Sequence, residues 1–183
     1  MKRQLICVVR LAALLACGSL AVGCGGSSSS SPTAPSAPAI TNTSWAPGVN
    51  IGPVFLGATF SAVQAELGAP DSTSYTAGDG TSPSATQARY NAPGIAVFFA
   101  DSDNDQQLDE GETVHSIVLI DLLSTLSISH AFRYLGLGLG STHAEVLGAM
   151  GSPRFDSASS SFYLSGVMFS YDAQGVVTAI VIM

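Results

Sequence analysis

Six of the chain's 13 acidic residues lie within the twelve positions from Asp101 to Glu112. The segment reads DSDNDQQLDEGE, with acids at alternate positions at its start and a glutamate at its end. This spacing matches the calcium loop D-x-[DN]-x-[DN]-G-x5-E except at Gln106, where glycine is usual. Calcium takes about six to eight hard oxygen ligands in a flexible shell, which carboxylates and carbonyls supply. The segment therefore predicts a calcium site.

Each expected ligand of this site has a role. We expect one carboxylate oxygen each from Asp101, Asp103 and Asp105, the backbone carbonyl of Gln107, a direct or water-mediated contact from Asp109, and a bidentate carboxylate from Glu112. Gln106 is the weak position, because a left-handed conformation at this turn costs a residue with a side chain about 1–2 kcal/mol. The alternative is a solvated acidic turn. We favour a metal because six acids this close repel one another unless a cation offsets them.

The acidic segment lies between two runs of β-branched and aromatic residues, 95–99 and 114–120. Such runs, bounded by turn residues, predict strands. The calcium loop would therefore connect the strands of a β-hairpin, and no helices would flank it. Further strands are expected around 86–90, 161–164, 166–171 and 177–183.

Two segments of the chain resemble each other. Residues 56–70 align without gaps with residues 139–153, and Leu, Gly, Thr, Val, Gly and Pro recur at matching places. In the second segment Thr142 and Glu145 have the spacing of a capping box at a helix start. Gly151 suits the left-handed residue that ends a helix. Each segment therefore predicts one short helix.

The similarity continues into the expected strands, because 94–99 matches 166–171 and 114–120 matches 177–183. We therefore expect an α+β fold of two tandem repeats, residues 45–121 and 134–183. Each repeat would be a short helix followed by a three-stranded antiparallel meander, and both would form one domain over residues 44–183. In the second repeat, the turn 172–175 would close a tight hairpin.

The N-terminus has the pattern of a targeting signal. Residues 1–23 combine a basic start with a short apolar stretch, which is typical of a secretory signal peptide. Leu20-Ala21-Val22-Gly23-Cys24 resembles the bacterial lipobox, so Cys24 is the expected lipidation site. Cys17 is a competing lipobox cysteine, and an ordinary cleaved signal is the other alternative.

Residues 24–43 are rich in Gly, Ser and Pro and predict a tether. Flexible chain of this length reaches roughly 20–25 Å, which would hold the folded part near a membrane without placing it in the bilayer. Gly25 follows the lipidated cysteine, and by resemblance to the Gram-negative sorting rule the lack of Asp there favours the outer membrane.

Composition excludes several classes of function. From residue 24 onward the chain has three arginines, no lysine and 13 acids, which gives a net charge of −10. No basic stripe can form, so binding to nucleic acid or to anionic lipid is not expected. All three cysteines fall within the first 24 residues, so the folded part has no disulfide and no cysteine metal site.

No pattern of a catalytic site accompanies the acidic loop. The sequence has no G-x-S-x-G elbow, and its three histidines, His115, His130 and His143, are scattered. The glycine run of residues 136–140 is explained by a turn into the second expected helix rather than by a nucleotide. We therefore expect a protein that is not an enzyme.

The glycine turn, the capped helix ending in Leu/Met-Gly-x-Pro and the terminal hairpin resemble two groups of proteins over most of residues 45–183. One group is the BamE/SmpA-type outer-membrane assembly lipoproteins, and the other is the β-lactamase inhibitor protein (BLIP-like) fold. The resemblance implies a cell-envelope location and a role in binding other proteins.

These observations predict a lipid-anchored, non-catalytic envelope protein that presents its folded domain to a protein partner, with a calcium-stabilised hairpin loop. The membrane would be contacted through the lipid anchor only. The alternative is a secreted-type inhibitor or a domain that binds a small ligand.

Overall fold

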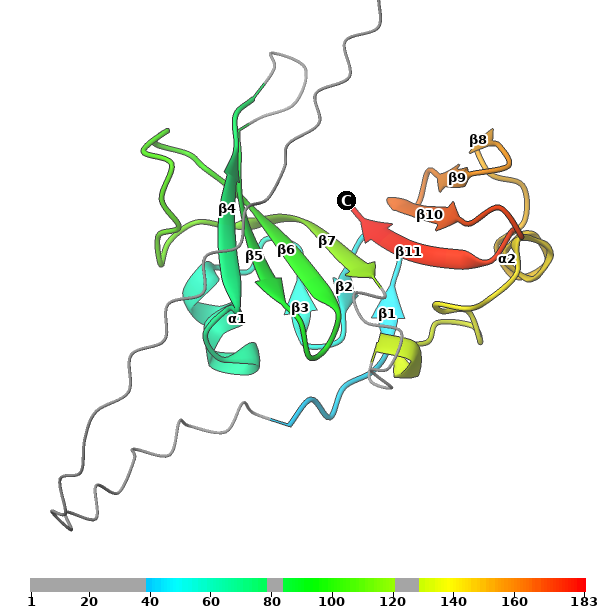
Figure 1. Cartoon of the computed structure of the whole chain (residues 1–183), viewed down its shortest axis with the longest axis horizontal. Helices are drawn as coiled ribbons and strands as arrows, with labels where there is room; N and C mark the ends of the chain where they lie inside the picture. The colour runs from blue at the N-terminus through cyan, green and yellow to red at the C-terminus, as the bar shows by residue number, and fades with distance from the viewer. Residues whose placement is uncertain (1–38, 79–83, 121–128) are drawn as a thin grey trace, which may run out of the picture. The chain divides into compact units, whose positions relative to one another are not determined.

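Two antiparallel sheets and two short helices make up the fold (Figure 1). The structure is a computed structural model that describes residues 39–78, 84–120 and 129–183, all within the unit Ser36–Met183. The smaller sheet has three two-residue strands, β1 (Trp45–Ala46), β2 (Asn50–Ile51) and β3 (Val54–Phe55). The larger sheet has eight strands in the order β4-β5-β6-β7-β11-β10-β9-β8.

The larger sheet contains two groups of four consecutive strands. The first group is β4 (Ser72–Thr76), β5 (Ala85–Tyr90), β6 (Ile95–Ala100) and β7 (Val114–Ile120). The second group is β8 (Phe155–Asp156), β9 (Ser160–Tyr163), β10 (Val167–Tyr171) and β11 (Val177–Ile182). Antiparallel pairing of β7 with β11, which places Ile117 opposite Ile182, joins the groups into one sheet.

The two α-helices are eight residues long, α1 (Phe60–Leu67) and α2 (His143–Met150), and a 3-10 turn, η1, spans Ser129–Ala131. Both α-helices begin at a threonine whose side chain accepts a hydrogen bond from a backbone N–H, as N-caps do. The predicted capping box of Thr142 and Glu145 is confirmed. Gly151 caps the end of α2 with φ of 77°, as predicted.

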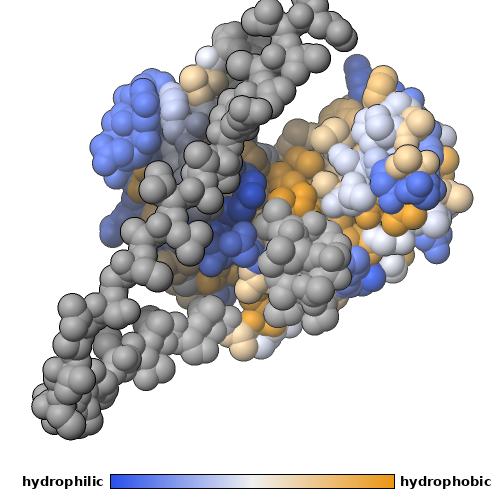
Figure 2. Space-filling view, in the orientation of Figure 1, coloured by the Kyte–Doolittle hydropathy of each residue, from blue (hydrophilic) through white to orange (hydrophobic). Residues whose placement is uncertain are grey.

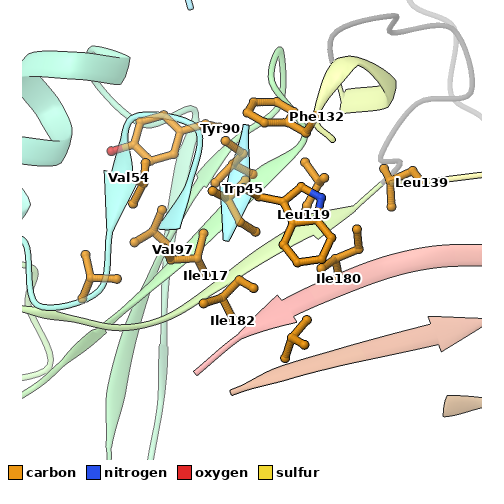
Figure 3. Packing of buried hydrophobic residues seen from close by; sticks show 14 of the residues in the cluster. Trp45, Val54, Tyr90, Val97, Ile117, Leu119, Phe132, Leu139, Ile180 and Ile182 are labelled. Carbon is orange, nitrogen blue, oxygen red and sulfur yellow. The ribbon is translucent and has the colours of Figure 1, made fainter. Parts of the chain in front are cut away.

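One continuous apolar core joins both sheets and both helices. Alternation along β6 sends Ile95, Val97 and Phe99 into this core, where each is fully buried. Trp45 lies at its centre near Leu119 and Ile180 (Figure 3), and the Trp45 Nε1–H donates to the Leu137 carbonyl at 3.1 Å. Elements far apart in the sequence therefore depend on the same buried side chains.

The predicted fold class is wrong. The described residues form a mostly β structure of eleven strands in two sheets, with only two short helices, and not two repeats of a helix followed by a three-stranded meander. The separate expected strands are found at 85–90, 95–100, 114–120, 160–163, 167–171 and 177–182. The error lies in the strands that were not expected and in the pairing that unites the large sheet.

The missed strands of the large sheet are its two edges, β4 and β8. Side chains in β4 are mostly exposed, and both residues of β8 are exposed, so neither strand has the apolar alternation that marks a half-buried strand. Backbone hydrogen bonds to one neighbour hold such an edge strand in place. The Ser and Thr residues that form most of β4 resemble a loop in the sequence.

Several predictions about the N-terminal part lie outside the described residues. These are the signal peptide of residues 1–23, the lipidation site Cys24 and most of the tether of residues 24–43. The described chain packs from Ile40 onward, and the Asn42 side chain donates to the Gly52 carbonyl at 3.0 Å. In the described ranges no helix has both the length and the apolarity that crossing a membrane requires.

Candidate metal centre

The acidic loop connects β6 to β7, as predicted, and forms a hydrophilic projection at the left of the view in Figures 1 and 2. Asp101 follows β6 directly, and Glu112 lies two residues before β7. Carboxylate oxygens of Asp101, Asp103 and Asp105 lie within 4.8 Å of one another. The structure therefore brings three of the six predicted ligands into one group that could hold a metal ion.

Two of the predicted ligands are buried without partners. The residues Asp101 and Glu112 are each only 6% exposed. All four of their carboxylate oxygens are inaccessible, and none has a hydrogen-bond partner of ordinary geometry among the described residues. Buried polar groups are nearly always hydrogen-bonded, and buried carboxylates require pairing or a metal. A cation bound in the loop would supply a partner to both carboxylates.

The raised pKa of Glu112 is consistent with a cation bound in the loop. Burial raises the pKa of the Glu112 carboxyl, and the negative charge of Asp101 raises it further. Both effects disfavour the ionised carboxylate. A cation in the loop would offset them, because a nearby positive charge favours the ionised form. The backbone of Asp109 acts in the opposite direction and lowers this pKa, but by less than burial and Asp101 raise it.

The backbone of the loop adopts the left-handed conformation where the calcium pattern requires it. Gln106 has φ of 67° and Asn104 has φ of 61°. Asparagine tolerates this region well, whereas glutamine does so at a cost. The Asp105 carboxylate closes the turn by accepting from the Gln107 N–H at 2.8 Å. The left-handed conformation predicted at Gln106 is therefore present.

The remaining predicted ligands are less directly placed. The Gln107 carbonyl accepts a hydrogen bond from the Thr86 hydroxyl at 3.3 Å, and one lone pair stays free for a second interaction. Asp109 is exposed, and its backbone carbonyl accepts from the Glu112 N–H at 3.1 Å. Of the predicted carboxylate ligands, Asp109 and Glu112 lie outside the aspartate group that is within metal-binding distance.

A second polar cluster was not predicted. The His143 Nε2 lies 2.9 Å from an Asp156 carboxylate oxygen and 3.3 Å from the Ser161 hydroxyl. The Tyr171 hydroxyl donates to the Ser161 oxygen at 2.9 Å, and the Ser161 hydroxyl itself donates to Asp156, whose pKa this bond lowers. These residues come from α2, β8, β9 and β10, and no spacing pattern in the sequence relates them.

This cluster has the residue types of a serine hydrolase but not the geometry. A catalytic triad places serine and aspartate on opposite nitrogens of the histidine ring. Here Asp156 and Ser161 contact the same nitrogen, and Ser161 is 0% exposed, out of reach of a substrate. The cluster joins α2 to β8 and β9, and we assign it a structural role.

A shallow cavity of about 270 Å³ lies beside α2. It is lined by Leu135, Gly136, Leu137, Ser141, Glu145 and Ala149. Its one carboxylate, that of Glu145, is engaged by the Thr142 N–H at 2.7 Å in the capping box. The glycines of the run 136–140 with positive φ, Gly136 and Gly140, form turns before the helix, as predicted.

Comparison with known proteins adds no relative. No family model, no curated protein and no solved structure matches the chain. The function is therefore argued from the loop itself.

Proposed function

We propose that this protein is a non-catalytic protein of the cell envelope, lipid-anchored at Cys24, whose β6–β7 loop binds a calcium ion that stabilises the hairpin. The observation that carries the metal site is the pair of buried carboxylates, Asp101 and Glu112, which have no hydrogen-bond partner among the described residues. A divalent cation bound by one oxygen of Asp101 and both oxygens of Glu112 would give both buried carboxylates a partner and offset the repulsion within the loop.

Calcium fits the donor set better than other common metals. Every expected ligand atom in the loop is a hard oxygen, and the loop has no histidine or cysteine. Soft or borderline metals prefer nitrogen and sulfur ligands. Magnesium requires a small, near-ideal octahedron, whereas calcium accepts the larger and less regular shell of a flexible loop.

The proposed ligands are the six that the sequence pattern predicts. Asp101, Asp103 and Asp105 form the group already within metal-binding distance, and Glu112 would join them from the far end of the loop. The Gln107 carbonyl and the Asp109 carboxylate would complete the shell after small movements of the exposed part of the loop. A site outside the cytoplasm could bind as weakly as roughly 10⁻⁴–10⁻³ M and still be filled.

The metal proposal is tested by thermal unfolding and calorimetric titration of the intact protein with calcium. We expect the melting temperature to rise with calcium and to rise less with magnesium. Asp101→Asn and Glu112→Gln should remove most of the rise. Glu110→Gln is the matched control, because this exposed acid lies in the same loop and is not an expected ligand. A melting temperature that is unchanged by millimolar calcium and by chelator would refute the site.

The anchor is tested by replacing the lipidation cysteine. Cys24→Ser, combined with Cys17→Ser to remove the competing lipobox, should release the protein from the membrane fraction. Continued fractionation with the membrane after both changes would show that lipid is not the tether.

The interaction role is tested by affinity purification from native membranes followed by mass spectrometry. We expect an envelope protein to be recovered with the wild type and less of it with Asp101→Asn, which lacks the stabilised loop. Turnover of a substrate by the purified protein would contradict the non-catalytic proposal.

A further inference from the structure

The end of the acidic loop also holds the start of helix α1. The backbone N–H of Phe60 donates to the Glu112 carbonyl at 2.8 Å, and that of Ser61 donates to the Glu110 carbonyl at 3.2 Å. The first N–H groups of a helix have no partner within the helix and must find one elsewhere. Two of those of α1 find it in the loop that contains the candidate metal ligands.

Helix α1 depends on this attachment and on the core. An isolated helix of eight residues is not stable in water, so packing must hold it. Its buried side chains are Phe60, Val63 and Leu67. The Phe60 ring packs edge-on against that of Phe99, with centroids 5.4 Å apart, and Phe99 lies two residues before Asp101. The first residue of the helix therefore contacts Glu112 at one end of the loop and Phe99 in strand β6, just before the other end.

We propose that metal binding in the β6–β7 loop controls the docking of helix α1: a bound cation holds Glu112 where its carbonyl accepts from Phe60, and loss of the cation releases the start of the helix. This inference rests on the proposed calcium site and adds a regulated element to it. The observations that carry it are the Glu112–Phe60 hydrogen bond and the unpartnered Glu112 side chain, which belong to the same residue.

The backbone groups of Asp101 and Glu112 bond to different parts of the structure. Asp101 is held next to the sheet, because its N–H donates to the Ser84 carbonyl and the preceding Ala100 N–H donates to Thr113. Glu112 lies outside β7, and its N–H bonds only within the loop, to the Asp109 carbonyl. Movement of Glu112 toward water would relieve its buried charge, and it would break the bond to Phe60.

Helix α2 provides an internal control. The N–H of its first residue, His143, donates to the Gly175 carbonyl at 2.8 Å, as that of Phe60 does to Glu112. Gly175 lies in the short β10–β11 turn and has no side chain to carry charge. The two helices thus begin in the same way, but only α1 begins on a residue that is also a metal ligand.

The first test is hydrogen–deuterium exchange of the intact protein with calcium and with chelator, read on peptides that cover residues 56–67 and 139–150. Removal of calcium should speed exchange in the α1 peptide by about fivefold or more, the lower end of ordinary coupling between sites. The α2 peptide should change by less than about twofold. Calcium binding with unchanged α1 exchange, or with equal changes in both helices, would overturn this inference while leaving the calcium site intact.

The second test uses the reciprocity of linked equilibria, by which a weakened helix must weaken metal binding. Thr59→Ala removes the N-cap of α1 and touches no expected ligand, and it should raise the calcium Kd by about threefold or more. Thr142→Ala removes the N-cap of α2 and is the matched control, with an unchanged Kd. Equal Kd values for the wild type and both variants would contradict the coupling.

Discussion

The β6–β7 and β10–β11 hairpins each hold the start of an α-helix, but their loops differ in length and charge. Each has a register shift near its end, at Phe98/Phe99 in one and at Ser170/Tyr171 in the other. Each then supplies a backbone carbonyl to the first N–H of an α-helix. The connecting residues are 101–113 in the first hairpin and only 172–176 in the second.

The short β10–β11 turn supplies hydrogen bonds to its own carboxylate. The Asp172 carboxylate accepts hydrogen bonds from the N–H groups of Gln174 and Val176, each at 2.9 Å. Gly175 takes the positive φ of 75° that closes the turn at no steric cost. The β10–β11 turn is therefore complete without a ligand.

The long β6–β7 loop supplies no hydrogen bond of ordinary geometry to its two buried carboxylates. Its two buried carboxylates have no partner in the described part of the chain, and its positive φ values fall on Asn104 and Gln106 rather than on glycine. The same helix attachment is therefore unconditional in one hairpin and, on our proposal, dependent on a cation in the other.

The largest effect is expected from cutting the large sheet between its two groups of strands. A fragment of residues 134–183 contains the complete β10–β11 hairpin, but it lacks β7, the neighbour of β11, and it lacks Trp45. A chain of this length can barely bury a core. We expect it to be unfolded or aggregated by circular dichroism. A cooperative thermal transition in this fragment would show that the closed hairpin and its helix are self-sufficient.

The next largest effect is expected from giving the first hairpin the turn of the second. Replacing residues 100–112 with the sequence Asp-Ala-Gln-Gly, as in 172–175, should preserve the attachment of α1 and abolish its dependence on calcium. The increment lost is about 2.7 kcal/mol at a hundredfold excess of calcium over its Kd. The measurement is the melting temperature with calcium and with chelator.

A length-matched Gly/Ser loop in place of residues 102–111 is the control for this exchange. It should also lose the calcium response, but it should not recover the stability of the calcium-bound wild type. If both replacements are equally unstable, the short turn does not preserve the attachment of α1.

Glu112→Gln is expected to change stability in opposite directions with and without metal. In calcium the variant should lose roughly 2 kcal/mol relative to the wild type, because a bidentate ligand is gone. In chelator at neutral pH it should be at least as stable, because an amide in place of the carboxylate removes a buried, unpaired charge. Loss of stability in both conditions would mean that Glu112 is structural only.

The pH dependence of the metal-free protein follows from the raised pKa of Glu112. A carboxyl with a raised pKa stabilises the folded state below its unfolded pKa of about 4.3, and this contribution is lost as pH rises through the folded value. Calcium competes with the same proton, so its stabilising increment should grow over the same pH range. Chemical unfolding from about pH 4 to pH 8, with Glu112→Gln as the control, measures both trends.

The smallest effects are expected from exchanging the left-handed residues of the two loops. Gln106→Gly should relieve strain, stabilise the protein by about 1 kcal/mol and tighten calcium binding. Gly175→Ala should cost about 1 kcal/mol through backbone strain alone, because an added Cβ would meet the His143 Cβ at an ordinary 3.9 Å. Chemical unfolding measures both, and the same sign for both would contradict the strain argument.

The candidate site could be predicted in part. The spacing of the acids identified the loop, and the departure at Gln106 identified the strained position, because both are properties of neighbouring residues. The burial of Asp101 and Glu112 could not be predicted, because burial is set by the tertiary fold and not by neighbouring residues in the sequence. The cluster of His143, Asp156 and Ser161 was missed for the same reason.

The sequence by itself determined the local structure: the capped helices, the strands with a buried face and the hairpin turn at Asp172. These depend on hydrogen bonds and alternation within a few residues. Only the tertiary structure decided that the edge strands β4 and β8 exist and that β7 pairs with β11 to make one eight-stranded sheet. It also decided that the side chains of Asp101 and Glu112 are buried. The physical reason is that edge pairing and burial are set by contacts between residues far apart in the chain, and no local pattern records them.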